Sequence, residues 1–239
     1  MSNILKVFIG YDTREDIAWQ VCRHSILRYA SRDIEIYPLK QSVLRETGLY
    51  TRPADQASTE FSLTRFLTPY LAAHEGWTIF VDCDFIFTCD IYNVLTEARG
   101  NKAVYVVKHD YIPANKIKMD NQVQTQYPRK NWSSFMLFDG RHPEVKALTP
   151  AIVNTAQPSF LHRFGWLHDE SIGELPLVWN FLVGEYPLSD KLPLAIHYTN
   201  GGPWFEEWRD VDYADLWCAE QDSYLYSLNS KIKLVPSEI

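Results

Sequence analysis

The stretch Trp77-Thr-Ile-Phe-Val-Asp-Cys-Asp84 decides the predicted fold. Residues 79–81 form a short continuous apolar run, which is typical of a strand buried on both faces. Residues i and i+2 of an extended chain point the same way, so Asp82 and Asp84 are expected on one face where the strand ends. We therefore expect the functional site at this end of the strand.

Two neighbouring carboxylates predict a metal site. Their charges repel, and burying both costs several kcal/mol unless a cation lies between them. Mg²⁺ and Mn²⁺ prefer oxygen ligands and also bind phosphate oxygens. The alternative is that one of Asp82 and Asp84 caps the following turn while the other is solvated, and Asp-x-Asp alone is a common pattern. A second apolar run at residues 85–87 favours the metal interpretation.

The composition indicates one large globular domain. The chain has 239 residues, of which 46% are hydrophobic and 14% aromatic, so disorder is excluded. A net charge of −7 argues against a nucleic-acid binder. The four cysteines are scattered, which favours reduced thiols over disulfides or zinc. Without an apolar run of membrane length or a signal-peptide pattern, we expect a cytoplasmic protein, and peripheral action at a membrane stays compatible.

The first half of the chain predicts a βαβ unit followed by a helix. Strands are expected at residues 5–9 and 34–39, with a helix between them after Thr13 and Asp16, which resemble a capping box. Residues 40–58 are expected to form a loop or lid. A helix is expected at residues 59–73, disturbed near Pro69. On chemistry alone Arg65 in that helix is a surface salt-bridge residue, and the functional alternative is a phosphate contact.

The second half predicts further alternation of helices and strands. A short helix is expected at residues 91–98, strands at 103–107 and 132–139, an irregular polar segment at 113–130, and helical residues at 143–155. A strand at 194–197 ends on His197. A lone histidine is more often structural than a ligand, but the Gly-Gly turn that follows makes His197 a candidate to complete a metal shell begun by Asp82 and Asp84. Gly201 and Gly202 follow, and glycine allows close approach of backbone to an anion. Alternating strands and helices predict an α/β fold.

These segments, in this order, resemble a GT-A glycosyltransferase of the retaining kind, similar to family eight, which includes glycogenin and bacterial lipopolysaccharide galactosyl- and glucosyltransferases. The resemblance covers most of the chain. It rests on Val-Phe-Ile-Gly-Tyr-Asp12, Leu-Thr-Arg-Phe66, Phe-Val-Asp-Cys-Asp84, Ser-Ser-Phe-Met-Leu-Phe-Asp139, His-Asp-Glu170, Val-Trp-Asn180 and His-Tyr-Thr-Asn-Gly-Gly-Pro-Trp204. It implies a Rossmann-like, mixed, mostly parallel sheet flanked by helices in a single domain of residues 1–239, with a nucleotide-binding half at 1–110 and an acceptor and sugar half at 111–239.

The resemblance also implies a nucleotide-diphosphate sugar donor, most often a UDP-sugar with Mn²⁺ (or Mg²⁺), and a glycan, lipid-linked glycan or protein acceptor. The residues assigned to donor binding are Tyr11 and Asp12 at the base and ribose, Arg65 at the diphosphate or sugar, Asp82 and Cys83 of the acidic stretch, and Trp132, Ser133 and Ser134 at the sugar. The resemblance assigns Asp84 and His197, with Asp82, to the metal. It places Asp169 or Glu170 near the anomeric carbon, so these two residues and Arg65 are the catalytic candidates.

Two departures leave alternatives open. The family's asparagine-alanine-glycine sequence is Trp132-Ser133-Ser134 here, so the donor sugar cannot be inferred. The lysine that the family usually places before Pro-Trp is Gly202 here. Candidate substitutes for its charge are the backbone N–H groups of Gly201 and Gly202, or the side chains of Arg65, Lys40 and Arg14.

Three alternatives concern the reaction. Within sugar transfer, front-face attack competes with a covalent route through Asp169 or Glu170. A sugar-1-phosphate nucleotidyltransferase is a second class of enzyme, although the single glycine in residues 10–14 argues against its glycine-rich loop. A glycan-binding relative without catalysis is the third, and intact Asp82, Asp84 and His197 argue against it.

Overall fold

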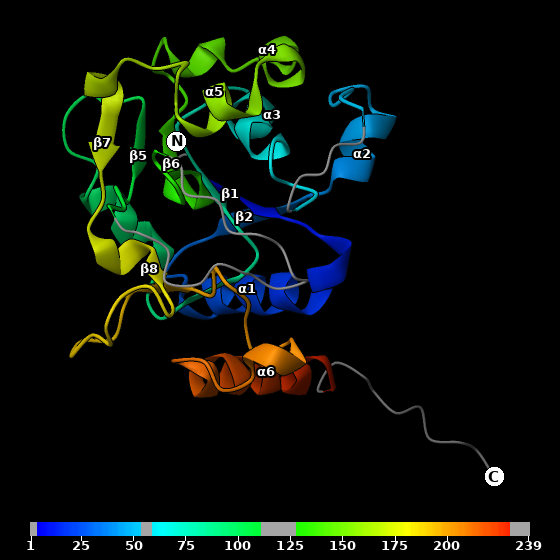
Figure 1. The fold of residues 1–239 in the computed structure, drawn as a ribbon, viewed down its shortest axis with the longest axis vertical. Helices are drawn as coiled ribbons and strands as arrows, with labels where there is room; N and C mark the ends of the chain where they lie inside the picture. Colours follow the sequence, from blue (N-terminus) through cyan, green and yellow to red (C-terminus); the bar gives the residue numbers. More distant parts are fainter. Residues whose placement is uncertain (1–3, 54–58, 111–127, 230–239) are drawn as a thin grey trace.

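The protein begins with a parallel βαβ unit. The computed structural model describes residues 4–53, 59–110 and 128–229 (Figure 1). Strand β1 (Leu5–Gly10) pairs in parallel with β2 (Ile34–Leu39), and helix α1 (Asp16–Tyr29) connects them. The buried residues of α1, which include Ala18, Val21, Cys22 and Ile26, recur every three or four positions. One helix face therefore packs on the protein interior, as the sequence predicts.

The main sheet is mixed and mostly parallel. Its order is β2-β1-β3-β6-β5-β7, with β3 at Trp77–Val81, β5 at Val104–Val106, β6 at Phe135–Asp139 and β7 at Ile172–Glu174. Strand β6 runs antiparallel to both neighbours, and the other described strands of this sheet share one direction. The predicted α/β class and the predicted strands in this sheet are confirmed.

A small second sheet begins where β3 ends. Its order is β4-β9-β8, with β4 at Phe85–Phe87, β8 at Phe181–Leu182 and β9 at Ala195–His197. Strand β9 pairs antiparallel with β4 and parallel with β8. Only residues 82–84 separate β3 from β4, so the acidic stretch lies at the junction of the two sheets.

Helices cover the main sheet on both sides. The short helices α2 (Gln41–Glu46), α3 (Thr68–Leu71), α4 (Pro150–Thr155) and α5 (Pro158–His162) gather on one side, and α1 lies on the other (Figure 1). Helix α6 (Ala214–Asn229) packs on α1. The buried Glu220 of α6 pairs with His24 at 2.6 Å and with Arg28 at 2.9 Å, both from α1.

Short 3₁₀ helices complete the secondary structure. They span Thr13–Glu15, Thr64–Leu67, Ile91–Thr96, Trp132–Ser134, Val145–Ala147, Asp169–Ser171, Leu177–Trp179 and Glu206–Trp208. The predicted helix at residues 91–98 is therefore a 3₁₀ helix, and the predicted helical segment at 143–155 is divided into Val145–Ala147 and α4.

Three local predictions in the first half are wrong. Residues 59–73 do not form one helix: turns lead into a 3₁₀ helix and then into α3, where Pro69 occupies the first turn, a position that needs no N–H. Helix α2 interrupts the loop predicted at 40–58, of which residues 54–58 lie outside the described residues. The turn before α1 is capped by Asp12, whose side chain accepts the N–H of Arg14, and not by a Thr13 capping box.

The strand predicted at 132–139 is observed as β6, which begins three residues later, at Phe135. Asn131 has a left-handed backbone, with φ of 62°, and residues 132–134 continue as a 3₁₀ turn before β6 starts. Of the segment predicted as irregular at 113–130, residues 113–127 lie outside the described residues. All four cysteines have free thiols, as expected. Among the described residues, no helix is long and apolar enough to cross a membrane.

Candidate active site

The acidic stretch is fixed to both sheets through its backbone. The N–H of Asp82 donates to the carbonyl of Ser134, next to β6, over 2.9 Å. The carbonyl of Asp84 accepts the N–H of Tyr198, next to β9, also over 2.9 Å. Since both ends are fixed, the two carboxylates have a defined position at the carboxyl end of β3.

Asp82, Asp84 and His197 form the predicted cluster. One ligand atom from each lies within 4.8 Å of the others, and Asp84 and His197 are buried. Two carboxylate oxygens and one imidazole nitrogen suit a hard or borderline divalent cation. The donor set therefore fits a divalent metal ion.

Asn180 sets the orientation of His197. Its Oδ1 lies 2.8 Å from Nδ1 of His197, while its Nδ2 donates to Ser134 Oγ over 2.8 Å. Because that amide orientation makes Oδ1 the acceptor, Nδ1 of His197 has the proton. Nε2 then faces Asp84 Oδ2 at 3.2 Å, either as a second N–H or as a lone pair that needs a cation between itself and the carboxylate. Phe85 stacks on the imidazole at 4.2 Å between ring centres.

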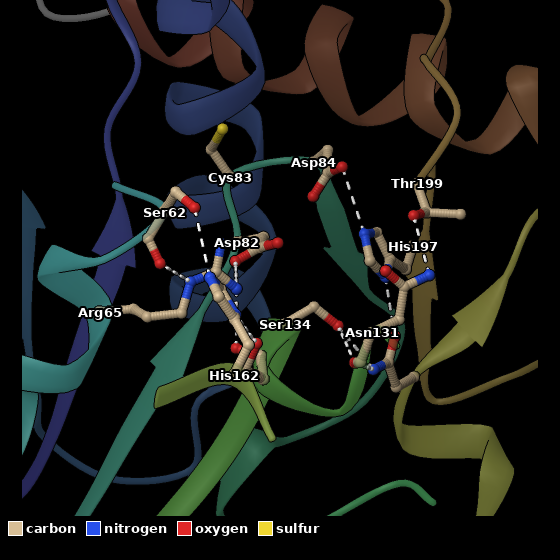
Figure 2. Close-up of polar contacts among 12 residues, drawn as sticks. Ser62, Arg65, Asp82, Cys83, Asp84, Asn131, Ser134, His162, His197 and Thr199 are labelled. Atoms are coloured by element: carbon tan, nitrogen blue, oxygen red, sulfur yellow. Dashed lines mark hydrogen bonds and ion pairs between the residues drawn. The ribbon is translucent and has the colours of Figure 1, made fainter. Parts of the chain in front are cut away.

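Asn131 extends this network. Its Nδ2 donates to Thr199 Oγ1 over 3.1 Å, and its carbonyl accepts the hydroxyl of Ser134 over 2.7 Å (Figure 2). The left-handed turn at Asn131 thus connects the start of β6 with the segment after β9. The imidazole of His197 is thus oriented by Asn180, and Asn180 is itself bound to Ser134 and Asn131.

Arg65 is buried, and the surface salt bridge expected for it on chemistry alone is wrong. Its NH1 lies 2.9 Å from Asp82 Oδ1 and donates to the carbonyl of Ser133 over 2.8 Å. Its Nε donates to the carbonyl of Ser62 over 3.0 Å. The rings of Phe61 and Phe80 lie 5.3 and 5.0 Å from its guanidinium carbon. Arg65 reaches Asp82 because the turns of residues 59–67 replace the expected helix.

His162 is a partly buried histidine beside Arg65. Its Nδ1 lies 3.0 Å from Ser133 Oγ, and its Nε2 lies 3.4 Å from Ser62 Oγ (Figure 2). Burial lowers the pKa of His162 to about 3, and the charge of Arg65 contributes in the same direction. The imidazole is therefore neutral at physiological pH.

The turn after β1 contains Tyr11 and Asp12. Lys40 Nζ lies 4.2 Å from the centre of the Tyr11 ring, and the phenol donates to Asp16 over 2.8 Å. Asp12 is fully buried and receives hydrogen bonds from the Arg14 side chain and from the N–H of Glu60. Burial opposes the charge of Asp12, but these bonds hold its pKa below the usual value. Asp12 thus fixes this turn, and Arg14 is bound to it.

Cys83 points away from the cluster (Figure 2). Its buried thiol lies 3.9 Å from Oε2 of Glu15, a carboxyl that is also buried. Burial raises the pKa of Glu15 well above its usual value, and the charges of Asp84 and Asp12 raise it further. Since the thiol faces the interior, a contact between Cys83 and the predicted nucleotide-sugar donor would have to use the backbone of Cys83.

The segment Trp132–Ser134 contributes to the support of the cluster. The carbonyl of Ser133 accepts Arg65, the hydroxyl of Ser134 binds Asn180, and the indole N–H of Trp132 donates to the carbonyl of His109 over 3.0 Å. The sugar contacts that the resemblance assigns to this segment stay a prediction.

Gly201 and Gly202 pack under tryptophan rings. A Cβ at Gly202 would lie 1.9 Å from the ring of Trp204, and one at Gly201 would lie 2.6 Å from the ring of Trp208. Gly201 also has a φ of 136°, which favours glycine. Its N–H already donates to the carbonyl of Tyr198 over 2.9 Å. The N–H of Gly201 is therefore engaged within the protein.

Asp169 and Glu170 lie away from the acidic end of β3. They precede β7. Through the register of β5 and β6, Ile172 of β7 lies level with Thr78 of β3 across the sheet. Asp82 follows Thr78 by four residues, about 13 Å along an extended strand. The Asp169 side chain is 79% exposed and pairs with Arg129 at 2.6 Å, which lowers its pKa. The carbonyl of Glu170 accepts Lys102 Nζ over 2.7 Å.

Sequence reasoning assigned no role to four residues of this site, namely Asn131, His162, Asn180 and Thr199, of which Asn180 and Thr199 are buried. Asn180 ends the Val-Trp-Asn motif, and its polar side chain directly after two apolar residues is the sequence feature that could have indicated a functional role. The others have no local pattern that separates them from ordinary loop residues.

The fold is similar to that of solved GT-A glycosyltransferases. WbbM, a bifunctional glycosyltransferase, superposes with a TM-score of 0.69 at 17% identity over 96% of this chain. GlyE, a glycosyltransferase of Streptococcus pneumoniae, gives 0.61 at 15% over 96%. The galactosyltransferase LgtC, in complex with donor and acceptor sugar analogues, gives 0.56 at 10% over 91% of this chain and 95% of LgtC. The chain spans 51% of WbbM and 64% of GlyE.

A curated relative then defines the family. The chain belongs to the family of Protein CDI of Arabidopsis thaliana, with which it is 51% identical over 224 residues, 92% of this chain and 86% of that protein. That name states no activity. No protein-family model matches the chain.

Proposed function

We propose that the protein is a metal-dependent glycosyltransferase that moves a sugar from a nucleotide-diphosphate sugar, UDP-sugar first, to an acceptor hydroxyl with retention of configuration. The main support is the cluster of Asp82, Asp84 and His197 beside the buried guanidinium of Arg65. Ligands for a cation and a donor for phosphate oxygens thus meet at the carboxyl end of β3. Open α/β sheets bind ligands at this end.

Each residue has a distinct task in this proposal. Asp82, Asp84 and His197 bind Mn²⁺ or Mg²⁺, which neutralises negative charge on the departing diphosphate. Arg65 orients the diphosphate, and it takes the part of the lysine that Gly202 replaces, since Arg14 is bound to Asp12 and the N–H of Gly201 is engaged.

The remaining donor contacts are also proposed. Tyr11, a half-buried ring with Lys40 over one face, stacks on the base, and Trp132, Ser133 and Ser134 border the sugar. The nucleotide therefore occupies residues 1–110, while residues 111–239 bind the sugar and a glycan, lipid-linked glycan or protein acceptor. A cytoplasmic location stays a prediction from the sequence.

The proposed step is front-face attack. The acceptor hydroxyl attacks the anomeric carbon on the side from which the diphosphate departs, and its proton passes to a phosphate oxygen. Asp169 and Glu170 act on the acceptor side, where the exposed Asp169 contributes negative charge. Asp169→Asn is expected to lower turnover about tenfold, less than the 10²–10⁴-fold loss of a positioned acid–base group, because Asp169 is exposed and paired with Arg129. Its unfolding temperature should not change, because exposed ion pairs add little stability.

Thermal unfolding with nucleotides tests the function. The protein is titrated with UDP, GDP, CDP and dTDP, each with and without Mn²⁺. A nucleotide at about a hundredfold over its dissociation constant adds roughly 2.7 kcal/mol to the free energy of unfolding. Strong stabilisation by one nucleotide only with metal supports the proposal. Stabilisation by none under any metal contradicts it and favours a glycan-binding relative without catalysis.

A further inference from the structure

Arg65 is held by two serines that lie far apart in the sequence. The carbonyl of Ser62 accepts Nε, and the carbonyl of Ser133 accepts NH1. These two bonds fix the plane of the guanidinium, because Nε and NH1 are parts of one rigid fork. The orientation of Arg65 toward Asp82 therefore depends on where Ser62 and Ser133 lie.

His162 binds the side chains of the same two serines. Nδ1 faces the hydroxyl of Ser133 at 3.0 Å, and Nε2 faces that of Ser62 at 3.4 Å. The imidazole comes from the end of α5, and Phe66 meets it edge to face at 5.3 Å between ring centres. One ring thus links the two backbone segments that enclose the arginine (Figure 2).

The chemistry of the three side chains suits this link. A neutral imidazole has one N–H donor and one lone-pair acceptor, and each serine hydroxyl can act in either sense. Since His162 stays neutral, it adds no positive charge beside the guanidinium. A lysine or arginine at this position would repel Arg65.

We propose that His162 is a positioning residue for Arg65: by linking Ser62 and Ser133 it holds the guanidinium in the one orientation that contacts Asp82 and the donor diphosphate. The diphosphate part rests on the proposed function. A free arginine side chain loses rotamer entropy when it is ordered. Because His162 orders the arginine through the two serines before the sugar donor binds, donor binding does not lose this entropy. Loss of the His162 hydrogen bonds should therefore weaken donor binding.

Two variants separate the hydrogen bonds from packing. His162→Phe keeps an aromatic ring against Phe66 and removes both bonds to the serines, whereas His162→Gln retains one donor and one acceptor. His162→Phe is expected to raise the dissociation constant of UDP with Mn²⁺ and the donor KM by about 10–100-fold, as loss of outer-shell partners does. His162→Gln should recover most of that affinity, and the acceptor KM should not change in either variant.

A double-mutant cycle with Arg65→Met tests whether the effect passes through the arginine. In the Arg65→Met background, His162→Phe should cause no further loss of UDP affinity. Unfolding temperatures of all variants measure packing separately. Unchanged UDP affinity in folded His162→Phe, or an undiminished loss in the Arg65→Met background, would overturn the proposal.

The link can also be observed without any ligand. The Arg65 Nε–H, identified by its absence from the NMR spectrum of Arg65→Met, should exchange slowly because the arginine side chain is buried and this N–H donates to the carbonyl of Ser62. His162→Phe should accelerate this exchange and His162→Gln should restore it. Equal exchange rates in all three proteins would refute the link. If the wild type shows the predicted exchange but binds no nucleotide, the proposed function fails and the link stands.

Discussion

Asp82 and Asp84 are one residue apart, yet they are paired with opposite kinds of partner. Asp82 faces the guanidinium of Arg65, which is enclosed by carbonyls and aromatic rings beside the main sheet. Asp84 faces the imidazole of His197, on the small sheet, which Asn180 orients. The two carboxylates of the acidic stretch are thus held by chemically different groups, a guanidinium at Asp82 and an imidazole at Asp84.

The difference indicates a division of tasks. A guanidinium has no lone pair at any accessible pH, so Arg65 cannot bind a metal ion but can bind carboxylate or phosphate oxygens. An imidazole with its Nδ1–H engaged presents Nε2 as a metal ligand. We infer that the Asp82–Arg65 side receives the diphosphate and that the Asp84–His197 side determines metal affinity.

The largest expected effect follows from loss of the metal side. Asp84→Ala removes a carboxylate ligand and should abolish metal-dependent turnover, a fall of at least about 10³-fold. Turnover is measured against Mn²⁺ concentration. Asp84→Asn, which keeps the shape and removes the charge, is the control for misfolding. Normal turnover in Asp84→Ala would remove the metal role assigned to this residue.

Arg65→Lys should affect the other side selectively. It keeps one charge but loses the planar fork, so donor affinity should fall by the value of a charged hydrogen bond, about 1.5–3 kcal/mol. Affinity for Mn²⁺ alone, measured by paramagnetic resonance, should change much less. If both affinities fell equally, the two sides would act as one unit and the comparison would fail.

Asn180→Ala should weaken the metal site without removing a ligand. His197 loses the acceptor of its Nδ1–H, and Mn²⁺ affinity should fall about 10–100-fold, as for other outer-shell partners. Asn180→Asp keeps an acceptor oxygen and should retain most of the affinity. Equal Mn²⁺ affinity in wild type and Asn180→Ala would show that His197 is oriented by other contacts.

The last prediction concerns acid stability. Burial lowers the pKa of His162 and of His109 to about 3, whereas an unfolded histidine titrates near 6.5. Because the folded pKa values are depressed, their contribution is full above pH 6.5 and is lost as pH falls toward 3. Each histidine should lower the free energy of unfolding by about 1.4 kcal/mol per pH unit in that range.

Urea unfolding between pH 7 and pH 5 checks this slope. His162→Gln should reduce the slope of unfolding free energy against pH by the amount that corresponds to one proton. His109→Gln should reduce it by the same amount. An unchanged slope in both variants would mean that these imidazoles are protonated in the folded protein. A positive charge on His197 would lower the pKa of His109 further, so the second variant also tests the surroundings of His197.

The sequence predicted the parts of the site that local patterns determine. An apolar run followed by two acids marks β3 and its carboxylates, and an apolar run that ends on His197 marks β9. These features need only the alternation of side chains in a strand and the high cost of burying a charge.

Contacts between distant segments account for the failures. Arg65 is buried because residues 59–67 form turns and a 3₁₀ helix and not the expected α-helix. Tertiary contacts determine this conformation, and helix propensity does not predict it. His162 meets Ser62 and Ser133 across gaps of 100 and 29 residues. The carboxylate of Asp12 caps its turn, a role that local sequence did not indicate, and its contact with the base and ribose stays a prediction.

X-ray diffraction at the manganese absorption edge, from crystals grown with Mn²⁺ and UDP, tests the division of tasks most directly. We predict one anomalous peak in contact with Asp84 and His197, with the diphosphate between that peak and the guanidinium of Arg65. A peak elsewhere, or UDP bound with no metal at this cluster, would contradict the account.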